Sequence, residues 1–366
     1  LPGDASRWRK VAEQLRGEFR WQRQAAGWEL AVDRLSVRSS ARAWPASALS
    51  LQFRQADTGK HLDLAGSYLH LGDLATAATL LPTLPVELRQ RLEEAGPTAA
   101  LQGPRLALRW SAEGLEDFKF YSRFSEGGLR PAAGWPGARG LAGELWVGRD
   151  GGRLRLDSQT GELRFAELFR GPLPFHSLQG EAFWRIGADG WILEAPELAV
   201  VNRDGRARAR LRLIGDGQGS PFIDLRAQLL DGNAAGTSRY LPVTKMPASV
   251  VGWLDAAGFR GRIPQADLVL FGRTKNFPFA DGSGVFDVQA KVANLRLAYR
   301  QDWPALHGVD GRLRFFANSM EAQVERGRIA GAGIQRAQVR IDQLGKAPLV
   351  FAGEARGSGD QLLGFL

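Results

Sequence analysis

The chain has 366 residues, a hydrophobic fraction of 44% and no cysteine. This length and apolar content allow a sizeable core and argue against intrinsic disorder, while the absence of cysteine excludes a disulfide framework and thiolate metal sites. The net charge is +9, and 41 of the 48 basic residues are arginines spread along the whole chain. That spread favours a solvated face over a nucleic-acid site, and contact with anionic lipid headgroups stays open as a third reading.

The apolar stretches of the chain predict no transmembrane helix within it. No stretch approaches 18 consecutive apolar residues, and no signal peptide is visible. The chain opens Leu1-Pro2-Gly3-Asp4 without methionine, so we interpret it as excised from a longer protein. The 45 glycines and 18 prolines indicate frequent turns between short elements.

The first predicted element with helical character covers roughly residues 72–95. Pro82 and Pro85 interrupt it, because proline lacks the backbone N–H that a helix interior needs. Gly96 suits its end, since glycine tolerates the left-handed conformation of a C-terminal cap.

Most of the remaining chain has an apolar period of two. In residues 206–213 every even position is arginine and every odd position is apolar. Side chains on a strand point alternately to opposite faces, so such a segment has one wet face and one apolar face. This is typical of an antiparallel sheet covered on one side only. The same alternation, less strictly kept, occurs in residues 105–110, 153–157, 295–299 and 337–342.

A second predicted helix covers roughly residues 247–257. Pro247 suits the first helical turn, and Gly258 suits the C-terminal cap. Val250 and Leu254 lie four positions apart and therefore share a face.

The two helical segments reveal an internal repeat. Pro85, Leu88, Leu92, Gly96, Leu106 and Leu108 match residues 162 positions later. Residues 15–21 match 178–184 at an offset of 163, and Trp135-Pro136 matches Trp303-Pro304 at 168. The ordered matches predict two copies of a unit of roughly 165 residues, a first at 1–170 and a second at 171–366, forming one continuous groove.

The predicted fold is mostly β: a long, twisted and curled antiparallel sheet forming an apolar groove, with short helical inserts. A contiguous apolar face is costly to leave in water, and the predicted helices are too few to cover it. A groove that shields acyl chains would solve this, because each buried CH₂ contributes about 0.8 kcal/mol. The predicted lining residues are Leu106, Leu108, Leu154, Leu156, Leu211, Leu213, Leu295, Leu297, Leu313, Phe315, Val339 and Ile341, some of which must instead pack under the helices.

The sequence offers little to catalysis or metal binding. No histidine has a metal-type spacing, so surface or strand-end positions are favoured for His61, His70, His176 and His307. The pairs Glu93-Glu94, at a helix end, and Glu116-Asp117, in turn-like sequence, are interpreted as solvated carboxylates. Residues 215–219 are read as a hairpin turn because the lysine and helix of a phosphate loop are missing.

Tryptophan is abundant, with 11 in the chain. Several recur at repeat-equivalent positions, which favours core packing or strand pairing over stacking on single-stranded nucleic acid. These are Trp21 with Trp184, Trp28 with Trp191, and Trp135 with Trp303.

Short stretches of the chain resemble the YhdP branch of the AsmA-like family. The resemblance is densest from about 238 to 366 and extends more weakly to the rest through the repeat. Its motifs are fold and turn motifs, so they identify a family better than a site. They are residues 238–242, 246–247, 253–254, 261–264, 268–272, 276–279, 282–286, 303–306, 352–357 and 362–366.

The resemblance implies a long periplasmic protein that an N-terminal helix, absent from this segment, anchors in the inner membrane. It implies phospholipid transport through an apolar β groove between the inner and outer membranes. The implied partners are phospholipid, components of both membranes and the rest of the full-length chain, with no nucleic acid and no cofactor.

Three functions are therefore weighed. A lipid-carrying groove is favoured by the one-sided strands, the repeat and the resemblance. A non-enzymatic scaffold of the cell envelope would use the same sheet, covered by helices or a partner. An enzyme acting on an envelope glycan is supported only by scattered carboxylates, so the sequence predicts no enzymatic activity.

Overall fold

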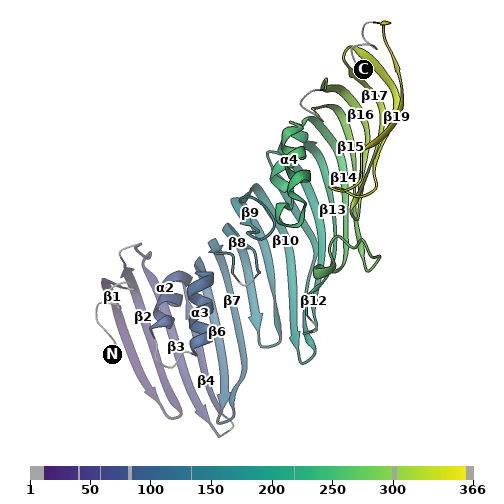
Figure 1. Ribbon diagram of the computed structural model, residues 1–366. Helices are drawn as coiled ribbons and strands as arrows, with labels where there is room; N and C mark the ends of the chain where they lie inside the picture. The colour runs from purple at the N-terminus through teal and green to yellow at the C-terminus, as the bar shows by residue number, and fades with distance from the viewer. Residues whose placement is uncertain are drawn as a thin grey trace. The chain divides into compact units, whose positions relative to one another are not determined.

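The computed structural model describes residues 12–39, 42–57, 59–80, 85–132, 134–217, 219–298 and 303–359. Its strands and short helices are drawn in Figure 1. The chain divides into two compact units. Unit 1 comprises Leu1–Phe165 and Glu181–Ile186, and unit 2 comprises Ala166–Gly180 and Gly187–Leu366.

The strands belong to one antiparallel sheet of 19 strands. Most strands pair with their neighbours along the chain, whereas β4 and β5 both pair with β6. Unit 1 holds β1 (Gln14–Gln24), β2 (Gly27–Arg38), β3 (Ser47–Ala56), β4 (Gly59–Gly66), β5 (Tyr68–His70), β6 (Thr98–Ser111), β7 (Gly114–Leu129), β8 (Gly137–Gly148) and β9 (Gly151–Arg164). The two units share β10 (Leu173–Gly187). Unit 2 holds β11 (Gly190–Asn202), β12 (Gly205–Gly215), β13 (Phe222–Asn233), β14 (Arg260–Arg273), β15 (Val285–Leu297), β16 (Leu306–Phe316), β17 (Ser319–Ile329), β18 (Ala332–Ile341) and β19 (Val350–Arg356).

The predicted mostly-β antiparallel fold is confirmed. Three of the five segments with a period of two lie wholly in strands, namely β6, β9 and β12. The other two begin in β15 and β18 and run past the ends of these strands, at Leu297 and Ile341. Alternation predicts strands well because, in a sheet that is covered on one face, successive side chains of a strand are alternately buried and exposed. Residue 299, the end of the fourth segment, lies outside the described residues.

Both predicted helical segments are confirmed as short helices. The first contains α2 (Leu71–Thr79) and α3 (Val86–Ala95), and the predicted break between them falls partly in residues 81–84, outside the described residues. The second is α4 (Ala248–Ala256), in which Val250 and Leu254 are buried. Short 3-10 helices are η1 (Ala234–Tyr240), η2 (Val243–Lys245) and η3 (Thr274–Asn276).

One turn prediction was wrong and another is confirmed. Glu116 and Asp117 lie inside β7, which begins at Gly114, directly after the two-residue turn at 112–113. Asp117 is already paired opposite Arg109 of β6. The glycine-rich stretch after β12 does connect that strand to β13, although residue 218 lies outside the described residues.

The element boundaries agree with the spacing of the predicted repeat. Both ends of β14 lie 162 positions after those of β6, and the first residue of α4 lies 162 positions after that of α3. The first residue of β11 lies 163 positions after that of β2. The division into two copies itself stays a prediction.

The buried apolar residues form small, separate clusters. In unit 1, Leu69, Ala99 and Leu101 form one such cluster, against which Leu71 of α2 and Phe124 pack. Figure 1 shows α2 and α3 lying over part of the sheet of unit 1. Since the clusters are local, much of each sheet face is left only partly covered.

Candidate functional site

The sheet of unit 2 carries apolar rows that cross many strands in register. Side chains directly opposite each other on paired strands share a face, so each row is a band of apolar side chains on one side of the sheet. One row crosses eight strands: Ala207, Leu229, Ala266, Ala290, Leu313, Ala322, Val339 and Phe351. The row beside it consists of Ala209, Ala227, Leu268, Val288, Phe315, Met320 and Ile341.

Unit 1 carries an equivalent row. It consists of Trp21, Leu30, Leu51, Leu64, Leu106, Phe120, Val147 and Gly152, each opposite the next. Leu108 lies two residues from Leu106 on the same face, and Leu154 lies two residues from Gly152. Each unit therefore presents one predominantly apolar face of alternating strand residues.

The structure places the twelve predicted lining residues on these apolar faces but in two environments. Leu295 is buried, in a cluster with Ala234 and Val309, and Leu297 packs against that cluster. The other ten are half-buried. This exposure is typical of a strand side chain that contacts its neighbours in the sheet but has no second layer of structure packed on top of it. Whether any of them contacts lipid stays a prediction.

The opposite face of unit 2 is polar. Arg206, Arg208, Arg210 and Arg212 of β12 are exposed or half-exposed side chains with their charged ends in water. The guanidinium of Arg212 lies 3.2 Å from Glu194, and that of Arg206 is paired with Asp231. Among the described residues, this face of β12 carries charged side chains that are exposed to water, whereas the other face carries apolar side chains.

A shallow hollow of about 790 Å³ lies in unit 1 over β3, β4, β6, β7 and β8. Most of its side chains belong to the polar face, among them Gln52, Asp63 and Lys119. At one end the Tyr121 and Trp146 rings lie 5.3 Å apart, and Arg153 lies over Trp146 at 5.1 Å. Sequence reasoning missed this aromatic cluster because it stands on the face that alternation marks as polar.

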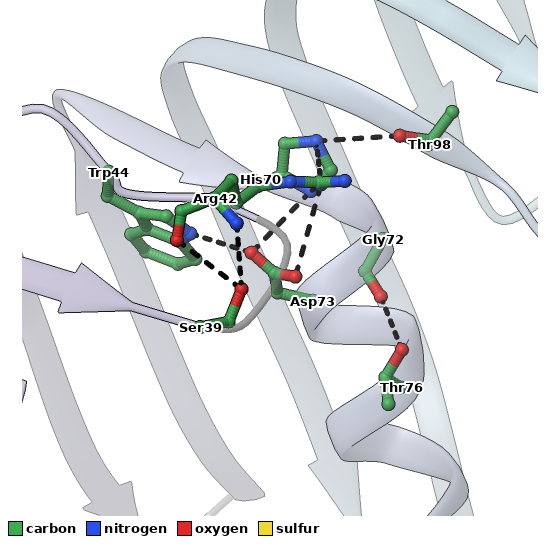
Figure 2. Close-up of polar contacts among 8 residues, drawn as sticks. All are labelled: Ser39, Arg42, Trp44, His70, Gly72, Asp73, Thr76 and Thr98. Carbon is green, nitrogen blue, oxygen red and sulfur yellow. Dashed lines mark hydrogen bonds and ion pairs between the residues drawn. The ribbon is translucent and has the colours of Figure 1, made fainter. Parts of the chain in front are cut away.

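A polar cluster joins α2 to the sheet of unit 1, as Figure 2 shows. The indole N–H of Trp44 donates to Asp73 at 2.7 Å, and a ring nitrogen of His70 lies 3.7 Å from the same carboxylate. The Arg42 guanidinium contacts the His70 ring, and the Thr98 hydroxyl lies 3.4 Å from its Nε2. His70 ends β5, as predicted for a strand-end histidine, but it is only 3% exposed.

This cluster brings a carboxylate, an imidazole and a hydroxyl together, so catalysis was considered. Burial lowers the pKa of His70, and the adjacent Arg42 charge lowers that pKa further. The imidazole is therefore held neutral, but it is enclosed, and its contacts with Asp73 and Thr98 are too long for strong hydrogen bonds. The cluster is best explained as a structural one, in which these contacts hold α2 and residues 42–44 against the sheet.

A second polar cluster holds η1 in unit 2. Asp204 is 7% exposed, accepts a hydrogen bond from the Tyr240 hydroxyl at 2.8 Å, and is paired with Arg239. Asn202 donates to the Tyr240 oxygen at 2.7 Å. Arg239 and Tyr240 come from the first family-like stretch, so that motif has a structural role here, attaching the insert to the β11–β12 turn.

Neither a metal centre nor a membrane-spanning helix is found in the part of the chain that the structure describes. No group of three or more histidine, aspartate or glutamate side chains there could hold a metal ion. No helix among the described residues is long and apolar enough to cross a membrane.

Comparison with known proteins places the chain in a family. The family described as YhdP protein matches residues 4–366. The chain belongs to the YhdP family. The chain is also similar to the intermembrane phospholipid transporter YhdP of Escherichia coli (strain K12), with 23% identity over 345 residues. That alignment covers 92% of this chain and 27% of the relative, so the chain spans about a quarter of that YhdP protein's length. No solved structure shows a significant match.

Proposed function

We propose that this chain is the part of a lipid-transport protein that shields phospholipid acyl chains against the apolar face of its sheet. The observation that carries the proposal is the set of apolar rows that cross up to eight strands in register and face away from a charged side of the sheet. Most side chains of the rows are half-buried, while Met320 is buried and Phe351 is exposed. Family membership and the name of the relative, an intermembrane phospholipid transporter, support the same function.

The chemistry of the rows suits acyl chains. A row of leucine, valine, alanine and phenylalanine offers dispersion contacts and no polar group that must be satisfied. Burial of each CH₂ contributes about 0.8 kcal/mol, so affinity would come from tail length and the headgroup could stay in water. No catalytic step is needed, and we infer that the chain acts without one.

The setting proposed is the periplasm, between the inner and outer membranes. The word intermembrane in the relative's name supports it. We further propose that the full-length protein has an inner-membrane anchor outside this segment and that it contacts components of both membranes. We also propose that one apolar groove continues from residues 1–170 into residues 171–366.

The test is native mass spectrometry of the gently purified chain, with lipid extraction of the same sample. Leu211→Asp places a charge on the apolar face at a half-buried position, and Arg210→Asp places the same charge on the polar face one residue away. Phospholipid should bind to the parent chain and to Arg210→Asp, and should be lost from folded Leu211→Asp. A lipid-free mass for the parent chain at every lipid load would refute the proposal and favour a scaffold.

Leu211 is a better position than Leu297 for this test. Leu297 packs against the buried cluster around Leu295, so a charge there would threaten the fold itself. Circular dichroism of each variant separates loss of lipid from loss of structure.

A further inference from the structure

One segment of unit 2 contacts the sheet at both ends of its strands. Residues 234–259, which we call the insert, lie between β13 and β14 and contain η1, η2 and α4. The insert leaves the sheet at Asn233 and rejoins it at Arg260, at the strand ends that we call the near rim. Antiparallel pairing places residues 343–347, between β18 and β19, at the opposite strand ends, which we call the far rim.

The insert lies over the apolar side of the sheet. Ala234 at its beginning belongs to the buried cluster of Leu295, and Phe259 at its end packs against that cluster. In the middle of the insert, Val250 of α4 is only 7% exposed. Since Leu295 stands on the apolar face, the insert is on the side of the sheet that carries the apolar rows.

The insert reaches the far rim through α4 and the residue before it. A Cβ placed at Gly345 would lie 3.3 Å from the Cβ of Pro247 and 3.6 Å from a methyl carbon of Val250. Residues 343–347 are themselves held at the far rim, because the Leu344 backbone N–H donates to the Asn318 carbonyl at 2.7 Å. The strand that follows the insert, β14, needs 14 residues to pass from one rim to the other. The insert therefore bridges the two rims across the apolar face.

The matching helix of unit 1 has a different environment. Leu88 in α3 lies 162 positions before Val250, and β6 after α3 lies 162 positions before β14. Leu88 is 46% exposed, whereas Val250 is 7% exposed. The helix alone does not bury this position, and its burial in unit 2 accompanies the contact with the far rim.

The attachments at the two rims differ in chemistry. At the near rim, the loop before β10 holds the insert: Arg170 lies 2.6 Å from Asp255, and the Thr244 hydroxyl donates to the Glu167 carbonyl. These polar bonds are directional and favour one geometry. At the far rim the insert presents only carbon atoms to Gly345. Such a contact contributes dispersion and burial, which an acyl chain can supply equally well.

We propose that the insert is a strap, hinged at the near rim and releasable at the far rim, and that phospholipid reaches the apolar rows beneath it only when the far-rim contact opens. The proposal rests on the proposed lipid function. Acyl chains fit against the rows, but a headgroup that stays in water has to pass where the strap closes the open side. Because lipid replaces the apolar contact that is lost, bound lipid favours the open strap.

The first test locks the strap with a disulfide. The chain contains no cysteine, so Pro247→Cys combined with Gly345→Cys can form a single intramolecular bond. The two Cβ atoms would lie 3.3 Å apart, close to the ~3.5–4.5 Å of natural disulfides. Mass spectrometry should show the bond after mild oxidation. Two free thiols under those conditions would show that the insert and the far rim are not in contact, and would overturn the proposal.

Lipid uptake is then read by photo-crosslinking at two matched positions. Benzoylphenylalanine replaces Leu268 in unit 2 or Leu106 in unit 1, which lies 162 positions earlier and is likewise half-buried. The lipid source is vesicles of phosphatidylethanolamine and phosphatidylglycerol. Oxidation should slow labelling at the Leu268 position at least about tenfold, reversibly on reduction, and should leave labelling at the Leu106 position unchanged.

The outcomes separate this proposal from the lipid function itself. Equal labelling at the Leu268 position in oxidised and reduced protein would overturn the strap and leave the lipid function standing. Labelling at neither position in either state would refute the lipid function, and the strap's role with it.

A substitution that opens the strap gives the converse test. Gly345 and Gly217 both lie at the far rim with φ of +80° and +71°, a conformation that asparagine tolerates. A side chain at Gly345 meets Pro247, whereas a Cβ at Gly217 has nothing within 4 Å. Gly345→Asn should raise hydrogen exchange of the α4 amides at least about threefold, and Gly217→Asn should not. Equal exchange in the two variants would overturn the releasable contact.

Discussion

Trp191 in β11 and Gly215 in β12 are directly opposite each other, and the indole occupies the space where a Gly215 side chain would stand. Gly215 is buried, and the three atoms nearest to a Cβ added at this position all belong to that ring. In unit 1 the Trp184 ring likewise occupies the space where a Gly152 side chain would stand.

Replacement of this glycine should destabilise the sheet. In Gly215→Ala the new methyl group overlaps the indole, which must leave its rotamer or push the strands apart, at a cost of about 1–3 kcal/mol. Urea denaturation measures the free energy of unfolding. A variant as stable as the parent would show that Trp191 can move without cost.

Gly252 should respond in the opposite direction. It lies in the interior of α4 and is exposed, and a methyl group added to it would meet no atom within 4 Å beyond its own helix backbone and chain neighbours. Alanine loses less conformational entropy in a helix than glycine, so Gly252→Ala should raise stability by about 0.5–1 kcal/mol. A fall in the thermal midpoint would indicate a contact on this face of α4.

The buried imidazole of His70 should make the stability of unit 1 depend on pH. Burial first, and Arg42 second, lower its pKa below the ordinary 6.5, so the folded state favours the neutral ring. The contribution is complete above about pH 6.5 and is lost as the pH falls below that value, because the unfolded chain then binds the proton more readily.

His70→Gln should therefore flatten the decline in urea midpoint between about pH 7.5 and about pH 5.5. His176→Gln, which removes an exposed histidine, serves as the control and should keep the decline of the parent. If the urea midpoint of His70→Gln fell with pH as steeply as that of the parent, the pH dependence would come from other groups.

The ion pair between Asp287 and Arg314 links β15 to β16 through two hydrogen bonds of 3.0 and 2.8 Å. The bond from Arg314 lowers the pKa of Asp287 below 3.8, so this contribution is present above about pH 4 and is lost as the pH falls through the lowered value. Asp287→Asn should cost about 1–2 kcal/mol at neutral pH, measured by urea denaturation, since its side chain is only 14% exposed.

The matched control for that pair is Arg340→Gln. Arg340 and Asp342 are also paired, but both side chains are largely exposed, at 63% and 64%, so their pairing should contribute little that is measurable. Equal losses in the two variants would mean that burial does not decide the strength of these pairs.

Asp204 should be the most sensitive residue of the η1 attachment. Asp204→Ala leaves the Arg239 guanidinium and the Tyr240 hydroxyl without their shared acceptor, at a cost of about 2–4 kcal/mol. Increased proteolysis within residues 234–245 would locate the loss at η1. Asn202→Ala removes two hydrogen bonds from the same network, one donated to the Tyr240 oxygen and one accepted from the Asp204 backbone N–H. It should cost less, because Asn202 is neutral and the ion pair of Asp204 with Arg239 stays in place.

Strand character, antiparallel pairing and the positions of the helices were predictable from the sequence. Alternation such as that of residues 206–213 is a local pattern, and strand geometry converts it directly into two chemically different faces. Glu116 and Asp117 mark the limit of that reasoning, because polar residues beside a hairpin turn resemble the turn itself.

Local alternation was enough to predict which residues share a face, with Leu211 and Leu213 on one side and Arg210 and Arg212 on the other. What each face contacts became known from the three-dimensional structure. Leu295 and Leu211 carry the same local pattern, yet one is buried against Ala234 and the other is half-buried. His70 is likewise enclosed by Arg42, Asp73 and Thr98, which come from separate segments. Burial depends on contacts between residues distant in the chain, and a local period contains no information about them.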